Sequence, residues 1–271
     1  MIPTQTEYTR ATTLEEALAA LRSGAKPIAG GMSLVPMMRL RLAAPDALVD
    51  LAALAELKGV REEGGEIVIG AMTRHRDVAT SDLLRRSCRV LAQAADGIGS
   101  PAVRNRGTIG GSLAHSDPHG DLPAALLAVG GSVTARSASG SRTIAAADLF
   151  VDYLTTSLAD DELIVDVRVP SDASASAYAK FHRRAIDWSI VGAAAAIRGG
   201  RVSVALTGLG SKPVRATAFE EVVNGGGSLE DAARRAGEGT SPIDDLDGSG
   251  EYKRHLAGVL ARRAVEAARA G

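Results

Sequence analysis

The chain has 271 residues, which is enough for two domains with substantial cores, and its formal net charge is −1. A protein surface that binds nucleic acid or an anionic membrane requires an excess of Lys and Arg. Because the net charge is near neutral, neither nucleic acid nor an anionic membrane is expected as a partner. Cys88 is the single cysteine, so the chain can form no internal disulfide and cannot ligate an iron–sulfur cluster by itself.

The first predicted elements lead into a glycine-rich loop. Thr13 and Glu16 form a capping-box pattern, and apolar residues at helical spacing predict a helix that ends before Gly24. Residues 26–29 predict a strand that enters the segment Ala29-Gly30-Gly31-Met32-Ser33. The next elements expected are strands over residues 47–51 and 66–72 and a helix over residues 81–95.

A second glycine-rich segment, Thr108-Ile109-Gly110-Gly111-Ser112, follows a loop over residues 96–105. After it the pattern predicts a helix over residues 121–129 and strands over residues 132–136, 142–145 and 162–169. Residues 170–176 are small and polar without a period, which predicts a linker between domains of residues 1–170 and 177–271. The second domain is expected to hold strands over residues 177–183, 190–197 and 202–209 and helices over residues 216–223, 229–236 and 252–270.

The two glycine-rich segments carry the strongest functional signal. Glycine adopts positive φ at no steric cost, so paired glycines can turn successive N–H groups toward an anion, and two such loops suit a diphosphate. Either pair alone is equally compatible with an ordinary turn. The chain lacks a phosphate-binding loop of the NTPase type, and Pro213 occupies the last position of its nearest approach to G-x-G-x-x-G.

With their flanks, residues 29–42 and 104–123 resemble the FAD-binding subunit of the molybdenum hydroxylases. This family includes the medium subunit of aerobic CO dehydrogenase and the flavin domain of xanthine dehydrogenase. Shorter matches extend the resemblance over essentially the whole chain, at Pro27 and residues 50–51, 69–71, 161–164, 178–181 and 183–184. It implies an α+β fold in which two small subdomains enclose FAD, followed by a smaller domain of three antiparallel strands and helices.

The resemblance also implies a role for individual residues. The two glycine-rich segments hold the diphosphate of FAD, Asp121 contacts its adenosine part, and Ile164 and Lys180 line the rest of the pocket. Ile98 lies near the isoalloxazine ring and Trp188 shields one face of it. The expected cofactor-binding residues are Ala29, Gly30, Gly31, Met32, Ser33, Ile98, Thr108, Ile109, Gly110, Gly111, Ser112, Asp117, Asp121, Ile164, Lys180 and Trp188.

Several of these residues have a purely structural alternative. Asp121 is equally suited to cap the helix that follows it, Lys180 to be an edge charge on a strand, and Trp188 to be a core or interface anchor. Met32 departs from the family, which usually has Gln or His there, so the first loop lacks one side-chain donor near the flavin.

His115, Asp117, His119 and Asp121 also form an H-x-D-x-H-x-D pattern that is compatible with a metal site. No metal is expected, because Pro118 and Gly120 form a loop whose side chains need not converge, and the family pattern already accounts for both aspartates.

The sequence contains no nucleophile, triad or paired carboxylates typical of a catalytic site, so the flavin itself is the expected reactive group. In the family, a molybdenum-cofactor large subunit oxidises the substrate and a [2Fe–2S] small subunit passes electrons to the flavin, which delivers them to an external oxidant. The resemblance implies that these subunits form a dimer of heterotrimers. Two alternatives remain: a self-contained flavin-dependent oxidase or reductase, and a non-enzymatic nucleotide-binding scaffold.

The location of the protein is expected to be the cytoplasm. The first ten residues lack the charged and apolar regions of a signal peptide, and no apolar stretch is long enough to span a bilayer.

Overall fold

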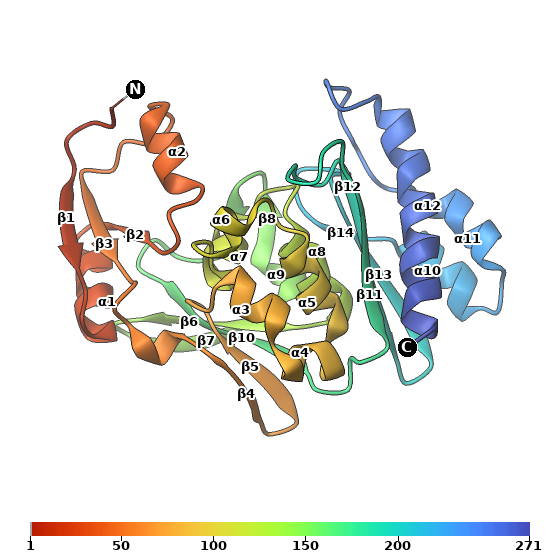
Figure 1. Cartoon of the computed structure of the whole chain (residues 1–271), viewed down its shortest axis with the longest axis horizontal. Helices are drawn as coiled ribbons and strands as arrows, with labels where there is room; N and C mark the ends of the chain where they lie inside the picture. Colours follow the sequence, from red (N-terminus) through yellow and green to blue (C-terminus); the bar gives the residue numbers. More distant parts are fainter. Residues whose placement is uncertain (1) are drawn as a thin grey trace.

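The computed structural model describes residues 2–271, and in this range β-sheets and helices alternate along the molecule (Figure 1). The N-terminal unit is a parallel sheet of strand order β1-β3-β2 with helix α1. Its elements are β1 (Glu7–Arg10), α1 (Leu14–Arg22), β2 (Lys26–Ile28), α2 (Leu34–Arg39) and β3 (Ala47–Asp50). Thr13 and Glu16 form the predicted capping box of α1, whose buried face holds Leu14, Ala17, Leu18 and Leu21. The pattern did not predict β1 or α2.

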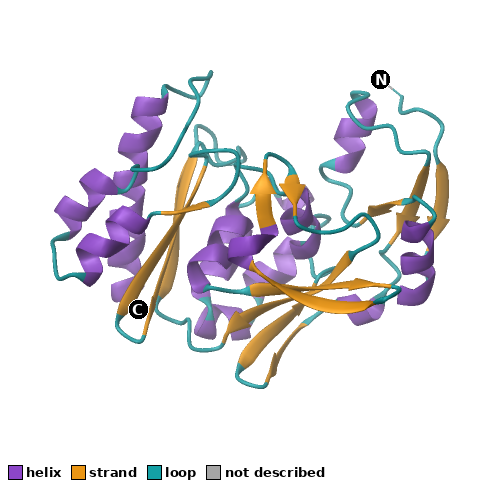
Figure 2. Cartoon of the chain, turned by 180° about the vertical axis from the view of Figure 1, so that it is seen from behind, coloured by secondary structure: helices purple, strands orange, loops and turns teal. Residues whose placement is uncertain are grey.

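The central unit is an antiparallel sheet of strand order β4-β5-β10-β6-β7. Its strands are β4 (Val60–Glu63), β5 (Glu66–Gly70), β6 (Ser132–Ser137), β7 (Gly140–Ala145) and β10 (Leu163–Pro170), and the hairpin β8 (Phe150–Asp152) and β9 (Thr155–Thr156) lies beside them. Helices gather on one face of this sheet (Figure 2). They are α3 (His75–Thr80), α4 (Asp82–Ser87), α5 (Arg89–Asp96), α6 (Pro101–Arg104), α7 (Ile109–His115), α8 (Asp121–Val129) and α9 (Ala146–Leu149). The short helix η1 (Ala55–Leu57) precedes β4, and its Leu57 belongs to the core of the N-terminal unit.

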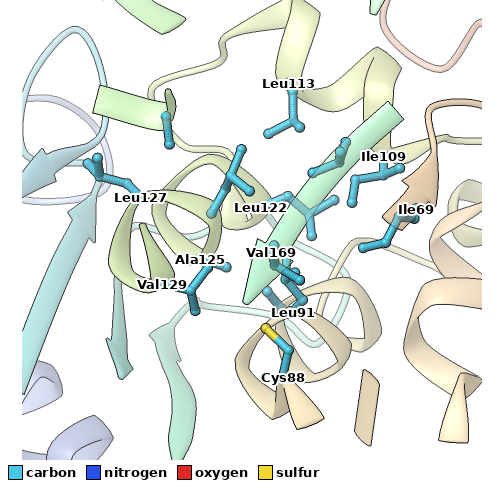
Figure 3. Packing of buried hydrophobic residues seen from close by; sticks show 14 of the residues in the cluster. Ile69, Cys88, Leu91, Ile109, Leu113, Leu122, Ala125, Leu127, Val129 and Val169 are labelled. Atoms are coloured by element: carbon cyan, nitrogen blue, oxygen red, sulfur yellow. The ribbon is translucent and has the colours of Figure 1, made fainter. Parts of the chain in front are cut away.

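Helix α8 forms the centre of the largest core, because every one of its residues is buried. The side chains of Leu122, Leu91, Val169 and Ile69 meet there, from α8, α5, β10 and β5 (Figure 3). The single helix expected over residues 81–95 is wrong in one respect. The non-helical backbone of buried Cys88 (φ −152°, ψ 65°) divides it into α4 and α5. Buried side chains at this corner fix a break that helix periodicity does not reveal.

The C-terminal unit is an antiparallel sheet of strand order β11-β12-β13-β14. Its elements are β11 (Ser176–Phe181), β12 (Val191–Arg198), β13 (Arg201–Thr207), β14 (Val214–Arg215), α10 (Thr217–Asn224), α11 (Leu229–Arg235) and α12 (Gly250–Arg269). The three expected strands are present, and the short β14 adds a fourth. Together with the preceding units, they confirm the α+β fold.

Strand β12 joins the last two units, because helices cover both of its faces. Ala194 and Ala196 belong to the core around α8, whereas Ala193 and Ala195 belong to the core beneath α10 and α12. Successive side chains of a strand point to opposite faces, and alanine lets the backbone of a helix approach either face closely. The C-terminal sheet is therefore held against the helices of the central unit.

Candidate functional site

The first glycine-rich segment is a loop between β2 and α2 that suits an anion. Gly31 has the expected positive φ of 73°, whereas Gly30 does not. Within residues 2–271, the backbone N–H groups of Gly30, Gly31, Met32 and Ser33 donate to no other group. Four successive N–H donors on a partly exposed loop can bind phosphate oxygens without displacing an internal bond. This observation fits the diphosphate of FAD.

The second glycine-rich segment is the start of a helix and not a turn. Thr108 is the N-cap of α7, and its Oγ1 accepts from the N–H of Gly111 at 3.2 Å. The N–H groups of Ile109 and Gly110 donate to the carbonyls of Thr73 and Ala71 at 3.0 and 2.8 Å. The expectation that these glycines adopt positive φ and present free N–H groups is therefore wrong for this segment.

Glycine is required at these positions because other backbone segments come close. A Cβ on Gly110 would lie less than 3.0 Å from Ala71, and a Cβ on Gly30 would lie less than 3.0 Å from the backbone of Arg106 and Gly107. A Cβ on Gly111 would lie 3.5 Å from that of Ala29. The two glycine-rich segments, far apart in sequence, thus lie side by side.

Asp121 is the centre of a buried polar cluster. Its Oδ1 accepts hydrogen bonds from the hydroxyls of Tyr178 at 2.6 Å and Ser189 at 2.5 Å. Its Oδ2 pairs with Nζ of Lys180 at 3.3 Å, and this ammonium also donates to the carbonyl of Gly97 at 2.8 Å. Burial and the adjacent carboxylate of Asp121 raise the pKa of Tyr178 well above 10, so its hydroxyl keeps the proton that it donates.

These contacts decide two of the structural alternatives. Gly120 is the N-cap of α8, and among the hydrogen bonds of the described residues none joins the Asp121 carboxylate to a backbone N–H, so the capping interpretation is wrong. The Lys180 side chain is 7% exposed and paired, so it is not an ordinary edge charge.

The other expected site residues differ in exposure. Trp188 is 65% exposed, and its Nε1 donates to Asp247 at 3.4 Å, so it is not a core anchor. Ile98 is partly buried beside Gly97. Ile164 is 4% exposed within the central core, and Met32 is 38% exposed at the loop surface. Their contacts with a flavin remain predictions.

The four side chains of the H-x-D-x-H-x-D pattern, from His115 to Asp121, do not share one common partner. Asp117 accepts from the backbone N–H of His119 at 2.8 Å, and Nδ1 of His119 faces the carbonyl of Ser189 at 2.8 Å. Nε2 of His115 lies 3.9 Å from Asp117. In the part of the chain that the structure describes, no three His, Cys, Asp or Glu side chains converge as metal ligands.

His75 lies directly behind the second glycine-rich segment. Its backbone N–H donates to the carbonyl of Gly107 at 3.0 Å, and its ring packs where a Cβ on Gly107 would lie. Nδ1 is buried and has no partner among residues 2–271. Burial lowers the pKa of His75 to about 4, so the imidazole is neutral at pH 7.

Sequence reasoning missed Ser189 and the hydrogen-bonding role of Tyr178. Ser189 is 68 residues from Asp121, and Tyr178 is 57 residues from it, so no local pattern links them. One signal was available, because Tyr178 and Lys180 are two residues apart on a strand and therefore share a face.

Comparisons with known proteins agree along the whole chain. The family described as "FAD binding domain in molybdopterin dehydrogenase" matches residues 4–172, and that described as "CO dehydrogenase flavoprotein C-terminal domain" matches residues 176–268. The carbon monoxide dehydrogenase medium chain of Hydrogenophaga pseudoflava is 38% identical, covering 99% of this chain and 98% of the relative. A subunit of the 6-hydroxypseudooxynicotine dehydrogenase complex of Paenarthrobacter nicotinovorans is 36% identical, covering 98% of this chain and 95% of the relative.

A solved structure agrees with the fold. A chain of the carbon monoxide dehydrogenase from Hydrogenophaga pseudoflava superimposes with a TM-score of 0.94 at 39% identity, covering 100% of this chain and 99% of that one. No helix within residues 2–271 is long and apolar enough to cross a membrane.

Proposed function

The chain belongs to the family of FAD-binding domains in molybdopterin dehydrogenases, and we propose that its flavin receives electrons from a [2Fe–2S] partner subunit and passes them to an external oxidant. The chain is a FAD-carrying subunit of an oxidoreductase of the molybdenum hydroxylase type. When bound, FAD can exchange electrons singly with one partner and in pairs with another. The protein supplies binding, orientation and electrostatics.

The observation that carries the cofactor site is the contact between the two glycine-rich segments. The loop of residues 30–33 offers successive N–H groups without internal acceptors, and it packs against Arg106 and Gly107 just before α7. We assign the diphosphate to this loop, with the start of α7 as its supporting wall. We propose the hydroxyls of Ser33, the N-cap of α2, and Ser112, in α7, as additional donors to the cofactor.

Asp121 and Lys180 are proposed to contact the remainder of FAD. They form a buried, oppositely charged pair, and buried charges are retained where they are paired and hydrogen-bonded. Ile98, Asp117, Ile164 and Trp188 complete the proposed pocket. Trp188 is exposed and precedes Ser189, whose hydroxyl donates to Asp121.

The chain needs partners for turnover. Its relatives are subunits of carbon monoxide and 6-hydroxypseudooxynicotine dehydrogenases. Its single cysteine, Cys88, is buried, and burial raises the pKa of the Cys88 thiol to about 12, so it ligates no cluster. We therefore propose a molybdenum-cofactor large subunit and a [2Fe–2S] small subunit as partners, in a dimer of heterotrimers located in the cytoplasm. Domains of residues 1–170 and 177–271 are part of the same proposal.

Purification from native cells tests this assignment. The chain is expected to co-purify with two further chains, and the complex to contain molybdenum, iron and non-covalent FAD. Heating or acid should release intact FAD into the supernatant. Recovery of FMN alone would contradict the proposal. So would recovery of the chain without partner subunits in a form whose flavin is reduced when substrate is added.

A further inference from the structure

A seam of hydrogen bonds joins the C-terminal sheet to the short segment that links α7 to α8. Residues 117–120 belong to this link, and Asp121, which follows them, is the first residue of α8. Pro118 contributes its carbonyl oxygen, which accepts from Oγ1 of Thr207 at 2.7 Å and from the backbone N–H of Gly208 at 2.8 Å. Both donors lie at the end of β13, almost ninety residues away in sequence.

Ser189 holds the other end of the same segment. Its carbonyl oxygen faces Nδ1 of His119 at 2.8 Å, and its hydroxyl donates to Asp121 at 2.5 Å. Ser189 and Thr207 are 0% and 1% exposed, so water does not compete for these bonds. Residues 118–121 are thus fixed from one side by groups of the C-terminal half.

The sheet is also shaped to admit these contacts. A Cβ on Gly192 would lie less than 3.0 Å from the Tyr178 hydroxyl and from Cγ2 of Thr207. Gly192 pairs with Lys180 on one side and Thr207 on the other. Glycine at this position therefore leaves the space in which Tyr178 reaches Asp121.

We propose that Ser189 and Thr207 are positioning residues for FAD: they fix residues 117–121 and thereby orient the Asp121 carboxylate toward the cofactor. The inference rests on the proposed role of Asp121. It makes the C-terminal sheet part of the cofactor site, since both buried hydroxyls donate to residues 117–121, Ser189 to Asp121 and Thr207 to the carbonyl of Pro118.

The test compares Ser189→Ala and Thr207→Val with Ser176→Ala in the full chain. Ser176 is a matched control, because its buried hydroxyl also joins the C-terminal sheet to the central unit, through Ala173 and Val90, without touching residues 117–121. Flavin-fluorescence titration of the FAD-free chain should show affinity about five- to tenfold weaker in the first two variants. The FAD affinity of Ser176→Ala should stay within about twofold of that of the wild type. Thr207→Ser keeps the hydroxyl and should therefore keep most of the affinity that Thr207→Val loses.

Two measurements show whether the seam itself has loosened. Amide hydrogen exchange of residues 117–121 should rise in Ser189→Ala and Thr207→Val, and not in Ser176→Ala. The chain has one tryptophan, Trp188, so the fluorescence anisotropy of the FAD-free Ser189→Ala chain reports on the adjacent loop and should fall.

Asp121→Asn separates the two ways in which the inference can fail. If Asp121→Asn binds FAD like the wild type, the proposed role of Asp121 is wrong. If a folded Asp121→Asn chain binds FAD more weakly while folded Ser189→Ala and Thr207→Val chains do not, the role of Asp121 stands and the positioning inference is overturned.

Discussion

The backbone carbonyl of Arg106 faces Gly30 so closely that a Cβ on Gly30 would lie less than 3.0 Å from it. Gly30 has no positive φ, so the requirement for glycine here comes from a neighbouring segment and not from the backbone angle. This contact fixes the β2–α2 loop against the residues that precede α7. It therefore determines where the N–H groups of the loop point.

Gly30→Ala should displace this loop. Backbone atoms cannot move aside as a flexible side chain can, so the added methyl should cost about 1–3 kcal/mol. Flavin titration should therefore show FAD affinity at least about fivefold weaker. Gly210→Ala is the control, because a Cβ on Gly210 meets nothing within 4 Å. Equal FAD affinity in the two variants would refute the role of the contact.

Gly110→Ala should lower stability even without FAD. The added methyl would meet Cβ and the carbonyl oxygen of Ala71. This carbonyl accepts the hydrogen bond from the N–H of Gly110 that holds α7 to the central unit. We expect the free energy of unfolding in urea to fall by about 1–3 kcal/mol. Ala114→Gly, on the exposed side of the same helix, should cost about 1 kcal/mol or less. A Gly110→Ala chain as stable as the wild type would show that α7 can shift freely.

The sequence predicted those features that depend on neighbouring residues. The capping box of α1 holds because Thr13 and Glu16 are three residues apart, and the strands of the C-terminal sheet follow from their apolar runs. The resemblance to a known family supplied the fold class. In contrast, β1 is exposed throughout and has no alternation of apolar and polar residues, so no pattern revealed it.

The site was predicted less completely, because its residues are determined by tertiary contacts between segments far apart in sequence. The glycines of α7 were attributed to positive φ, whereas Gly110 is required by the proximity of Ala71. Asp121 was a plausible helix cap from its position alone. Its actual partners, Tyr178, Lys180 and Ser189, come from strand β11 and the loop before β12, and sequence spacing does not encode that proximity.

The Lys180–Asp121 pair should be strongly coupled. Both side chains are almost fully buried, so Lys180→Met or Asp121→Asn alone leaves a buried charge without its partner and should cost about 3–5 kcal/mol. The double variant should recover part of this loss, because it leaves neither charge. Urea unfolding of all four proteins measures the coupling, and additive losses would argue against it.

His75 should make stability depend on pH. Its pKa is about 4 in the folded chain and near 6.5 when unfolded, so between these values the unfolded state binds more protons. Stability is therefore expected to fall as the pH decreases from about 6.5 to about 4, by about 3 kcal/mol from this residue. In His75→Gln, the difference between unfolding free energies at pH 7.5 and 4.5 should be smaller. Equal pH dependence in both proteins would show that His75 is not buried as a neutral ring.

The central claim is that electrons reach the flavin of this chain from a partner subunit. The most direct measurement follows the flavin absorbance anaerobically after substrate is added, first to the FAD-loaded chain alone and then to the complex reconstituted with its molybdenum and [2Fe–2S] subunits. The account predicts bleaching of the flavin band in the complex and none with the chain alone. Reduction of the isolated chain at the rate of the complex would contradict it and establish a self-contained flavoenzyme.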